Sequence, residues 1–142
     1  MTLPAVPPAP NRSAPTTFSQ RADDFLAWLV GLFTLGLGYG AGAGATVTQA
    51  TSRTTGVTIN AICGRITMVS AAGTTAWQSF VVTNSFMEIT DTVIVTQRTG
   101  ANLYTFAVKA GAGSFTLSAS AFLGTATEAN IVTFAIFKAI DL

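Results

Sequence analysis

The stretch Ser114-Phe-Thr-Leu-Ser-Ala-Ser120 alternates apolar residues with serine and threonine. In an extended chain, Phe115, Leu117 and Ala119 point to one side and the hydroxyl side chains to the other, because successive side chains of a strand alternate. This pattern is typical of an antiparallel strand with one buried face. It predicts that this part of the chain lies in a β-sheet and packs against a core on the Phe115 side.

Similar short runs recur on both sides of this stretch, and glycine or asparagine separates most of them, as expected of turns. The predicted strands are 46–49, 57–62, 65–69, 77–83, 92–97, 103–109, 114–120 and 131–138. Threonine is abundant here, and its β-branched side chain suits a pleated sheet. The pattern predicts a mainly β fold, an antiparallel β-sandwich or jelly roll over residues 46–142.

Two of the predicted strands are apolar on both faces. In one, Trp77 and Val81 alternate with other large apolar residues, and the strand from residue 131 shows the same feature. Such a strand must be covered twice, by its own core and by a neighbouring subunit. We therefore assign to the core or to a subunit interface Trp77, Phe80, Val82, Phe134 and Ile136.

Charged residues are scarce: they form 9% of the 142 residues, against about 25% in an ordinary soluble domain. The apolar fraction is 49%. So little charge solvates a lone monomer poorly, and we expect other chains to cover much of the surface. The net charge of +1 gives no electrostatic footprint for nucleic acid. The basic residues, Arg53 among them, are scattered singly and are expected to be solvated or paired surface charges.

Three N-terminal segments precede the β region. Prolines in residues 1–16 fix backbone angles and remove hydrogen-bond donors, which predicts an extended arm. Residues 17–35 are predicted to form an apolar anchoring helix, because Thr17 and Gln20 complete a capping box. One apolar stripe along it contains Phe18, Ala22, Phe25, Leu26 and Leu29. Alternating glycine and alanine in residues 36–45 indicate a hinge.

The 28 residues from Phe25 to Ser52 carry no charged side chain, so a transmembrane helix is an alternative for part of this stretch. Glycine argues against it, because each glycine costs a helix about 1 kcal/mol relative to alanine. No basic cluster flanks the stretch to set an orientation. We favour a helix that packs on sister helices or a docking partner. The alternative is a single-span membrane protein with an external β domain.

The residues of common catalytic and metal sites are missing. The chain has no histidine and one cysteine, Cys63, which excludes a thiol dyad with histidine and an internal disulfide and argues against a zinc site. Cys63 lies in an apolar run and is expected to be a small buried side chain. Glu88 and Asp91 are close together in one predicted loop and are expected to be solvated carboxylates rather than an acid/base pair. We predict no catalytic residue, no metal site and no cofactor, and hence no enzyme.

Two regions resemble proteins of tailed bacteriophages. Pro10-Asn-Arg-Ser-Ala-Pro-Thr-Thr-Phe18, with Arg21-Ala-Asp-Asp-Phe-Leu26, resembles an N-terminal anchoring arm of phage fibres and other tail-associated proteins. The second region is Thr46-Val-Thr-Gln-Ala-Thr-Ser-Arg-Thr-Thr-Gly-Val-Thr-Ile-Asn60 with Gly64-Arg-Ile-Thr-Met68. It is similar to a β domain that recurs in phage virion proteins.

The resemblance implies a virion component on the tail or capsid surface. Residues 1–35 would dock on tail, baseplate or capsid proteins, while the β domain forms a homotrimer. We assign the docking contacts to Arg12, Phe18, Arg21, Phe25, Leu26 and Leu29. The leading hypothesis is a short tail fibre or spike that presents the β domain to the host surface, where a receptor is a further candidate partner. Because the chain is short and lacks shaft repeats, a capsid decoration (cement or head-fibre) protein is the alternative.

Overall fold

The computed structural model describes residues 23–27, 39 and 42–139. The chain forms two units, Met1–Gly38 and Tyr39–Leu142, and each is considered by itself. In the first unit, residues 23–27 are helical and their side chains are exposed. They fall inside the predicted helix 17–35.

The other N-terminal predictions fall outside the described residues. They are the extended arm 1–16, the helix cap at Thr17 and half of the hinge 36–45. The hinge is shorter than predicted at its C-terminal end, because the first strand already begins at Gly44.

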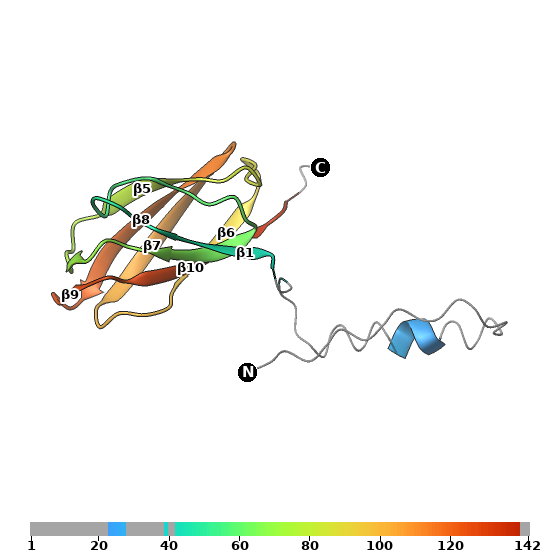
Figure 1. The fold of residues 1–142 in the computed structure, drawn as a ribbon, viewed down its shortest axis with the longest axis horizontal. Helices are drawn as coiled ribbons and strands as arrows, with labels where there is room; N and C mark the ends of the chain where they lie inside the picture. The colour runs from blue at the N-terminus through green and yellow to red at the C-terminus, as the bar shows by residue number, and fades with distance from the viewer. Residues whose placement is uncertain (1–22, 28–38, 40–41, 140–142) are drawn as a thin grey trace. The chain divides into compact units, whose positions relative to one another are not determined.

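The second unit is mainly β, as predicted. Its strands are β1 (Gly44–Thr48), β2 (Val57–Thr58), β3 (Cys63–Thr67), β4 (Ala71–Ala72), β5 (Gln78–Thr83), β6 (Thr92–Gln97), β7 (Leu103–Gly111), β8 (Ser114–Leu123), β9 (Thr127–Glu128) and β10 (Ile131–Phe137) (Figure 1). The short strands β4 and β9 were not predicted, since two residues are too few to show a period.

The strands form two four-stranded sheets and a small pair. Sheet A has the order β1-β3-β10-β6, sheet B has the order β2-β5-β8-β7, and β4 pairs with β9. Both large sheets are mixed, because β1 runs parallel to β3 and β2 runs parallel to β5. The prediction of an antiparallel sheet is therefore wrong at these two pairings. Alternation of side chains shows which face a residue takes but says nothing of strand direction.

The predicted strand 57–62 is also too long. After Thr58 the backbone makes one more bond to the sheet, from Ile59 N to Thr83 O at 3.0 Å. The next bond, from Ala61 N to Ile59 O at 3.1 Å, closes a tight turn. Ile59 and Ala61 nevertheless stay buried, so the apolar pattern here reflects burial rather than strand.

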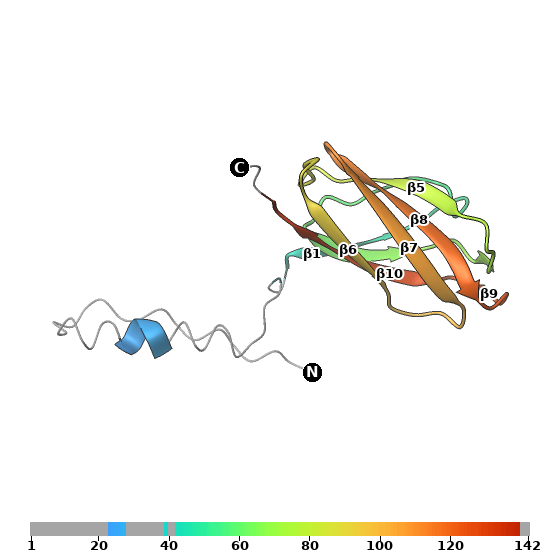
Figure 2. The ribbon, with the colours of Figure 1, turned by 180° about the vertical axis from the view of Figure 1, so that it is seen from behind.

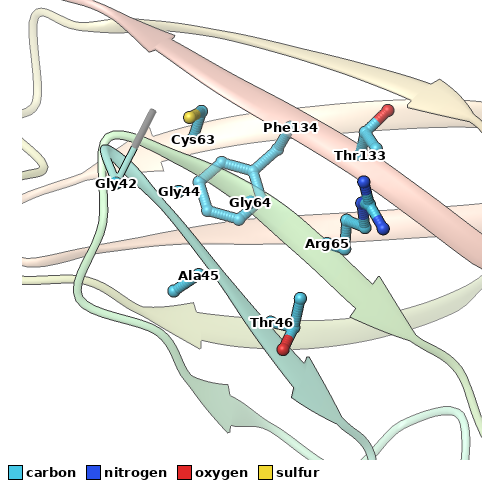
Figure 3. A pocket seen from close by; sticks show the side chains of 9 residues that line it. All are labelled: Gly42, Gly44, Ala45, Thr46, Cys63, Gly64, Arg65, Thr133 and Phe134. Carbon is cyan, nitrogen blue, oxygen red and sulfur yellow. The ribbon is translucent and has the colours of Figure 1, made fainter. Parts of the chain in front are cut away.

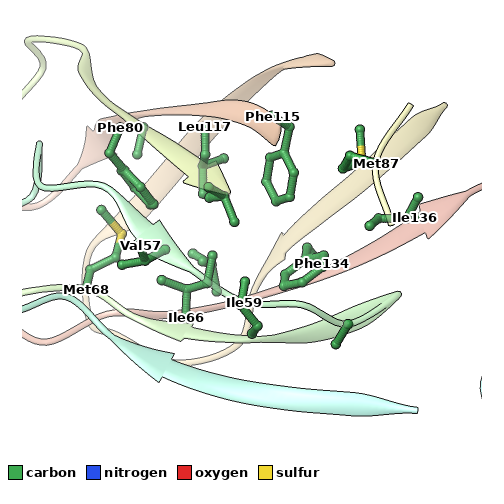
Figure 4. Close-up of a cluster of buried hydrophobic side chains, with 14 residues drawn as sticks. Val57, Ile59, Ile66, Met68, Phe80, Met87, Phe115, Leu117, Phe134 and Ile136 are labelled. Carbon is green, nitrogen blue, oxygen red and sulfur yellow. The ribbon is translucent and has the colours of Figure 1, made fainter. Parts of the chain in front are cut away.

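The core lies between the facing sides of the two sheets (Figure 4). Phe115 of β8 and Phe134 of β10 meet across it, with ring centroids 5.4 Å apart. Leu117 and Ile66 are fully buried on the same two sides. Each large side chain buried in this way contributes about 1.5–3 kcal/mol to folding. The alternation first seen at residues 114–120 therefore marks the inner face of sheet B.

The β domain has two distinct ends, which Figures 1 and 2 show. At the root end, β1 begins and β10 finishes, and Lys138 reaches the loop before β6. At the distal end lie the β4–β9 pair and the loop between β6 and β7, joined by the bond from Asn102 Nδ2 to Ala126 O at 2.7 Å. A segment entering at residues 42–44 is thus at the opposite end from the β4–β9 pair.

Candidate interaction surfaces

The residues assigned to core or interface separate into two groups. Phe80, Val82, Phe134 and Ile136 are buried inside a single chain. Trp77 is not, since 55% of it is exposed. It therefore lies outside the core of this chain.

The residues assigned to docking fall in the first unit. Phe25 and Leu26 belong to the helical residues 23–27, and both side chains are about half exposed. The other four lie outside the described residues: Arg12, Phe18, Arg21 and Leu29.

Large apolar side chains gather at the distal end of sheet B. Trp77 directly precedes β5, whose first residue pairs with Ala119, and Ser120 Oγ donates to Thr75 O at 2.8 Å. These contacts hold the Trp77 segment along the last part of β8. The exposed set, called the distal patch, consists of Trp77 (55% exposed), Leu103 (54%), Phe122 (77%) and Leu123 (63%).

Strand pairing brings the members of the distal patch together. Leu103 lies opposite Leu123, and a register shift follows between Leu103 and Tyr104. This irregularity lets two neighbouring apolar residues, Phe122 and Leu123, both reach solvent. Sequence reasoning missed three of the four residues. The signal was present, because the outward series from Ser114 to Ser120 continues with Phe122 in the same period of two.

The outer face of sheet A has a different character. Its register aligns Gly44, Cys63, Ala135 and Ile94 in one row across the sheet. The first three are small, and Ile94 is 51% exposed. Phe137, two residues beyond Ala135 along β10, is exposed to the same extent. Large apolar side chains therefore project from the β10–β6 side of this face. On the β1–β3 side, the same row contains only the small residues Gly44 and Cys63.

A hollow of about 520 Å³ lies on the β1–β3 side of this face (Figure 3). Six of the residues that line it have outward positions on β1, β3 and β10 or just before them: Gly42, Gly44, Thr46, Cys63, Arg65 and Thr133. Cys63 is only partly buried, which corrects the prediction that it is a core residue. The Cys63 side chain points outward from sheet A. The next residue, Gly64, takes the inward position, where a Cβ atom would meet the core side chains Ile59 and Phe134.

A buried arginine organises the distal end. Arg53 is 2% exposed, and its Nε donates to Val69 O at 3.0 Å. Its Nη2 donates to Ala71 O at 2.8 Å and to Glu128 O at 2.7 Å, and its Nη1 donates to the Tyr104 hydroxyl at 2.5 Å. The prediction of a solvated or paired surface charge is wrong for Arg53. It clamps the β4–β9 pair to β7.

A buried carboxylate occupies the root end. Asp91 is 5% exposed and forms an ion pair with Lys138, with Nζ 2.8 Å from Oδ2. Its oxygens also accept from Glu88 N at 2.8 Å and Ala139 N at 3.4 Å. The hydrogen bond from Lys138 is the largest cause that lowers the pKa of Asp91, and the same bond raises the pKa of Lys138. The prediction of a solvated carboxylate is wrong for Asp91. Both of its carboxylate oxygens accept hydrogen bonds from groups of the same domain.

Within 23–27, 39 and 42–139, no cluster of three or more histidine, cysteine, aspartate or glutamate residues could hold a metal ion. In that same part of the chain, no helix is long and apolar enough to cross a membrane. No family model, no curated protein and no solved structure gives a significant match to this chain.

Proposed function

We propose that this chain is a structural protein of a tailed-bacteriophage virion, a short homotrimeric fibre or spike. Residues 1–35 attach it to the particle, and the distal end of the β domain meets the host surface. One observation carries the proposal: the distal patch lies at the end of the β domain opposite the point where residues 42–44 lead into β1. Clustered exposed apolar side chains mark contact surfaces on small domains.

The proposal explains the low charge as well. A domain that meets neighbours along its length and a cell surface at its tip keeps little of its surface in permanent contact with water. Aromatic side chains such as Trp77 and Phe122 are enriched at the centres of such contacts, where a few residues supply most of the binding energy. The resemblance of residues 10–26 to phage anchoring arms supports the attachment role of the first unit.

The second candidate is a capsid decoration protein, in which the same arm lies across the joints between capsomers. Its support is that these 142 residues contain no shaft repeats. Immunogold labelling of purified virions separates the two, since label on the tail favours the fibre and label on the head favours decoration. A single-span membrane protein with an external β domain is the remaining alternative. It requires detergent to keep the full chain in solution.

The distal patch gives the functional test. Phages carrying Trp77→Ser with Phe122→Ser should adsorb to host cells at least tenfold more slowly. Val81→Ser is the matched control, because Val81 is 47% exposed on sheet B but lies outside the patch. Virion content of the protein, measured by mass spectrometry, should be equal in both. Unchanged adsorption would remove the host-contact role, and absence of the protein from purified virions would overturn the virion assignment itself.

A further inference from the structure

One face of the β domain carries both a hollow and the side chains that could fill it. The hollow beside Gly44 and Cys63 lies toward β1, an edge strand of sheet A. Ile94 lies on β6, the opposite edge strand, and Phe137 ends β10 beside it. Cys63 lies two strand spacings of about 4.8 Å each from Ile94, so Ile94 does not reach the part of the hollow beside Gly44 and Cys63 in its own chain.

We infer that the outer face of sheet A is the interface between copies in the proposed trimer: Ile94 and Phe137 of one copy pack into the hollow beside Gly44 and Cys63 of the next copy. This inference rests on the proposed function, which supplies the trimer. A contact in which different patches of one surface meet is heterologous, and it builds a closed ring when the rotation between copies closes.

The position of the chain ends selects a second copy as the occupant. Tyr39 donates its hydroxyl hydrogen to Ile136 O, and its ring lies 6.5 Å from that of Phe137. Tyr39, the first residue of the second unit, is therefore held beside the end of β10. If sheet A faces the symmetry axis, the Tyr39 residues of all copies lie at one end of the assembly. The distal patches then all point away from it.

Apart from the distal patch and Val81, the outer face of sheet B is polar along β8 and is less suited to this role. Along β8 its outward residues are Ser114, Thr116, Ser118 and Ser120. Ser118 already shares a hydrogen bond of 2.7 Å with Ser79 of β5. Hydroxyl side chains paired within one sheet are stable in water, whereas Ile94 and Phe137 gain free energy when they are covered.

Two variants with matched exposure test the choice of face. Ile94 and Val81 are 51% and 47% exposed, on sheet A and sheet B respectively. In the full-length protein, Ile94→Glu should reduce the mass in sedimentation experiments from three chains to one, because a buried unpaired charge is strongly unfavourable. Val81→Glu should stay trimeric. Circular dichroism checks that both variants fold.

A cysteine pair tests the contact itself, using the single native thiol. Ile94→Cys places a second thiol where the inference brings it next to Cys63 of another copy. Mild oxidation should then give covalent dimers and trimers on a denaturing gel. Removing the native thiol with Cys63→Ser in the same variant should abolish them, and Val81→Cys with native Cys63 should give none. Within one chain the two positions are separated by two strand spacings, too far for a disulfide.

The outcomes separate the inference from the function on which it rests. If the wild-type chain is monomeric at micromolar concentration, the proposed trimer is wrong. If the wild type is trimeric, but Ile94→Glu stays trimeric and the cysteine pair gives no covalent oligomer, sheet A is not the interface and the proposed function stands. Covalent dimers that persist with Cys63→Ser would show a two-fold contact through Ile94, which also contradicts the inference.

Discussion

The two ends of the β domain are each closed by one buried ionisable side chain, but with opposite chemistry. At the distal end Arg53 is held by carbonyl and hydroxyl oxygens. At the root end Asp91 is held by backbone amides and by Lys138, whose side chain is 48% exposed. The distal closure depends on uncharged oxygen acceptors, three of them backbone carbonyls, whereas the root closure depends on a charge pair partly in water. The two ends should therefore differ in cost of disruption and in response to pH.

Loss of the arginine should have the largest effect. Arg53→Met keeps an unbranched side chain but removes every donor to Val69 O, Ala71 O and Glu128 O. We expect the free energy of unfolding to fall by about 3–5 kcal/mol, because each buried carbonyl left without a donor costs about 1–3 kcal/mol. Urea unfolding at a fixed protein concentration measures this, since the stability of an oligomer depends on concentration.

Arg98→Met is the control for this comparison, because Arg98 is exposed on the same side of the domain. It should leave stability nearly unchanged. Equal stability of the two variants would mean that water replaces the guanidinium without cost, and that Arg53 does not hold the distal end together.

A smaller effect is expected at the root end. Asp91→Asn removes the negative charge and puts an amide donor against one of the backbone donors at Glu88 and Ala139. The ammonium of Lys138 can turn toward water, so part of the loss is recovered. The free energy of unfolding should fall below that of the wild type, but by less than in Arg53→Met. A change as large as that of Arg53→Met would contradict the view that the two closures differ.

Glu88→Gln provides the matched control. Glu88 also lies near Lys138, at 3.4 Å, but its side chain is 68% exposed. Exposed ion pairs contribute little, so this variant should be close to the wild type. Reduced stability of Glu88→Gln to the level of Asp91→Asn would show that total charge around Lys138 matters and burial of Asp91 does not.

These closures also show where sequence reasoning reached its limit. Alternation predicted β6 at its observed bounds, and it predicted the buried side of β8 at Phe115, Leu117 and Ala119, because the period of two follows directly from strand geometry. Burial of Arg53 has no such local signal. It depends on carbonyl groups of residues 69, 71 and 128, which converge only when the chain has folded.

The interaction surfaces were partly readable for the same reason. Trp77 was singled out because its strand is apolar on both faces, and alternation correctly separates it from Phe80. Its exposure and its proximity to Leu103 depend on pairing between β5, β7 and β8, which the sequence does not fix. The hollow at Gly44 depends on the parallel pairing of β1 with β3, and periodicity carries no information on direction.

The pH dependence should sharpen the contrast with the smallest change. The folded-state pKa of Asp91 lies below its ordinary value of 3.8, because Lys138 and two backbone amides bond to the charged form. Its contribution is therefore fully present above about pH 4 and is lost as the pH falls through the lowered pKa.

The pKa of Lys138 lies above its ordinary value of 10.5, so its contribution is present below that pH and is lost as the pH rises through the raised pKa. The root closure should thus stabilise the domain between about pH 4 and pH 10.5. The free energy of unfolding, measured from pH 2 to pH 7, should decrease less steeply on acidification in Asp91→Asn than in the wild type. In Arg98→Met it should decrease as in the wild type. If Asp91→Asn loses stability in acid as steeply as the wild type, another carboxylate governs the acid response and Asp91 is not the titrating group of the root end.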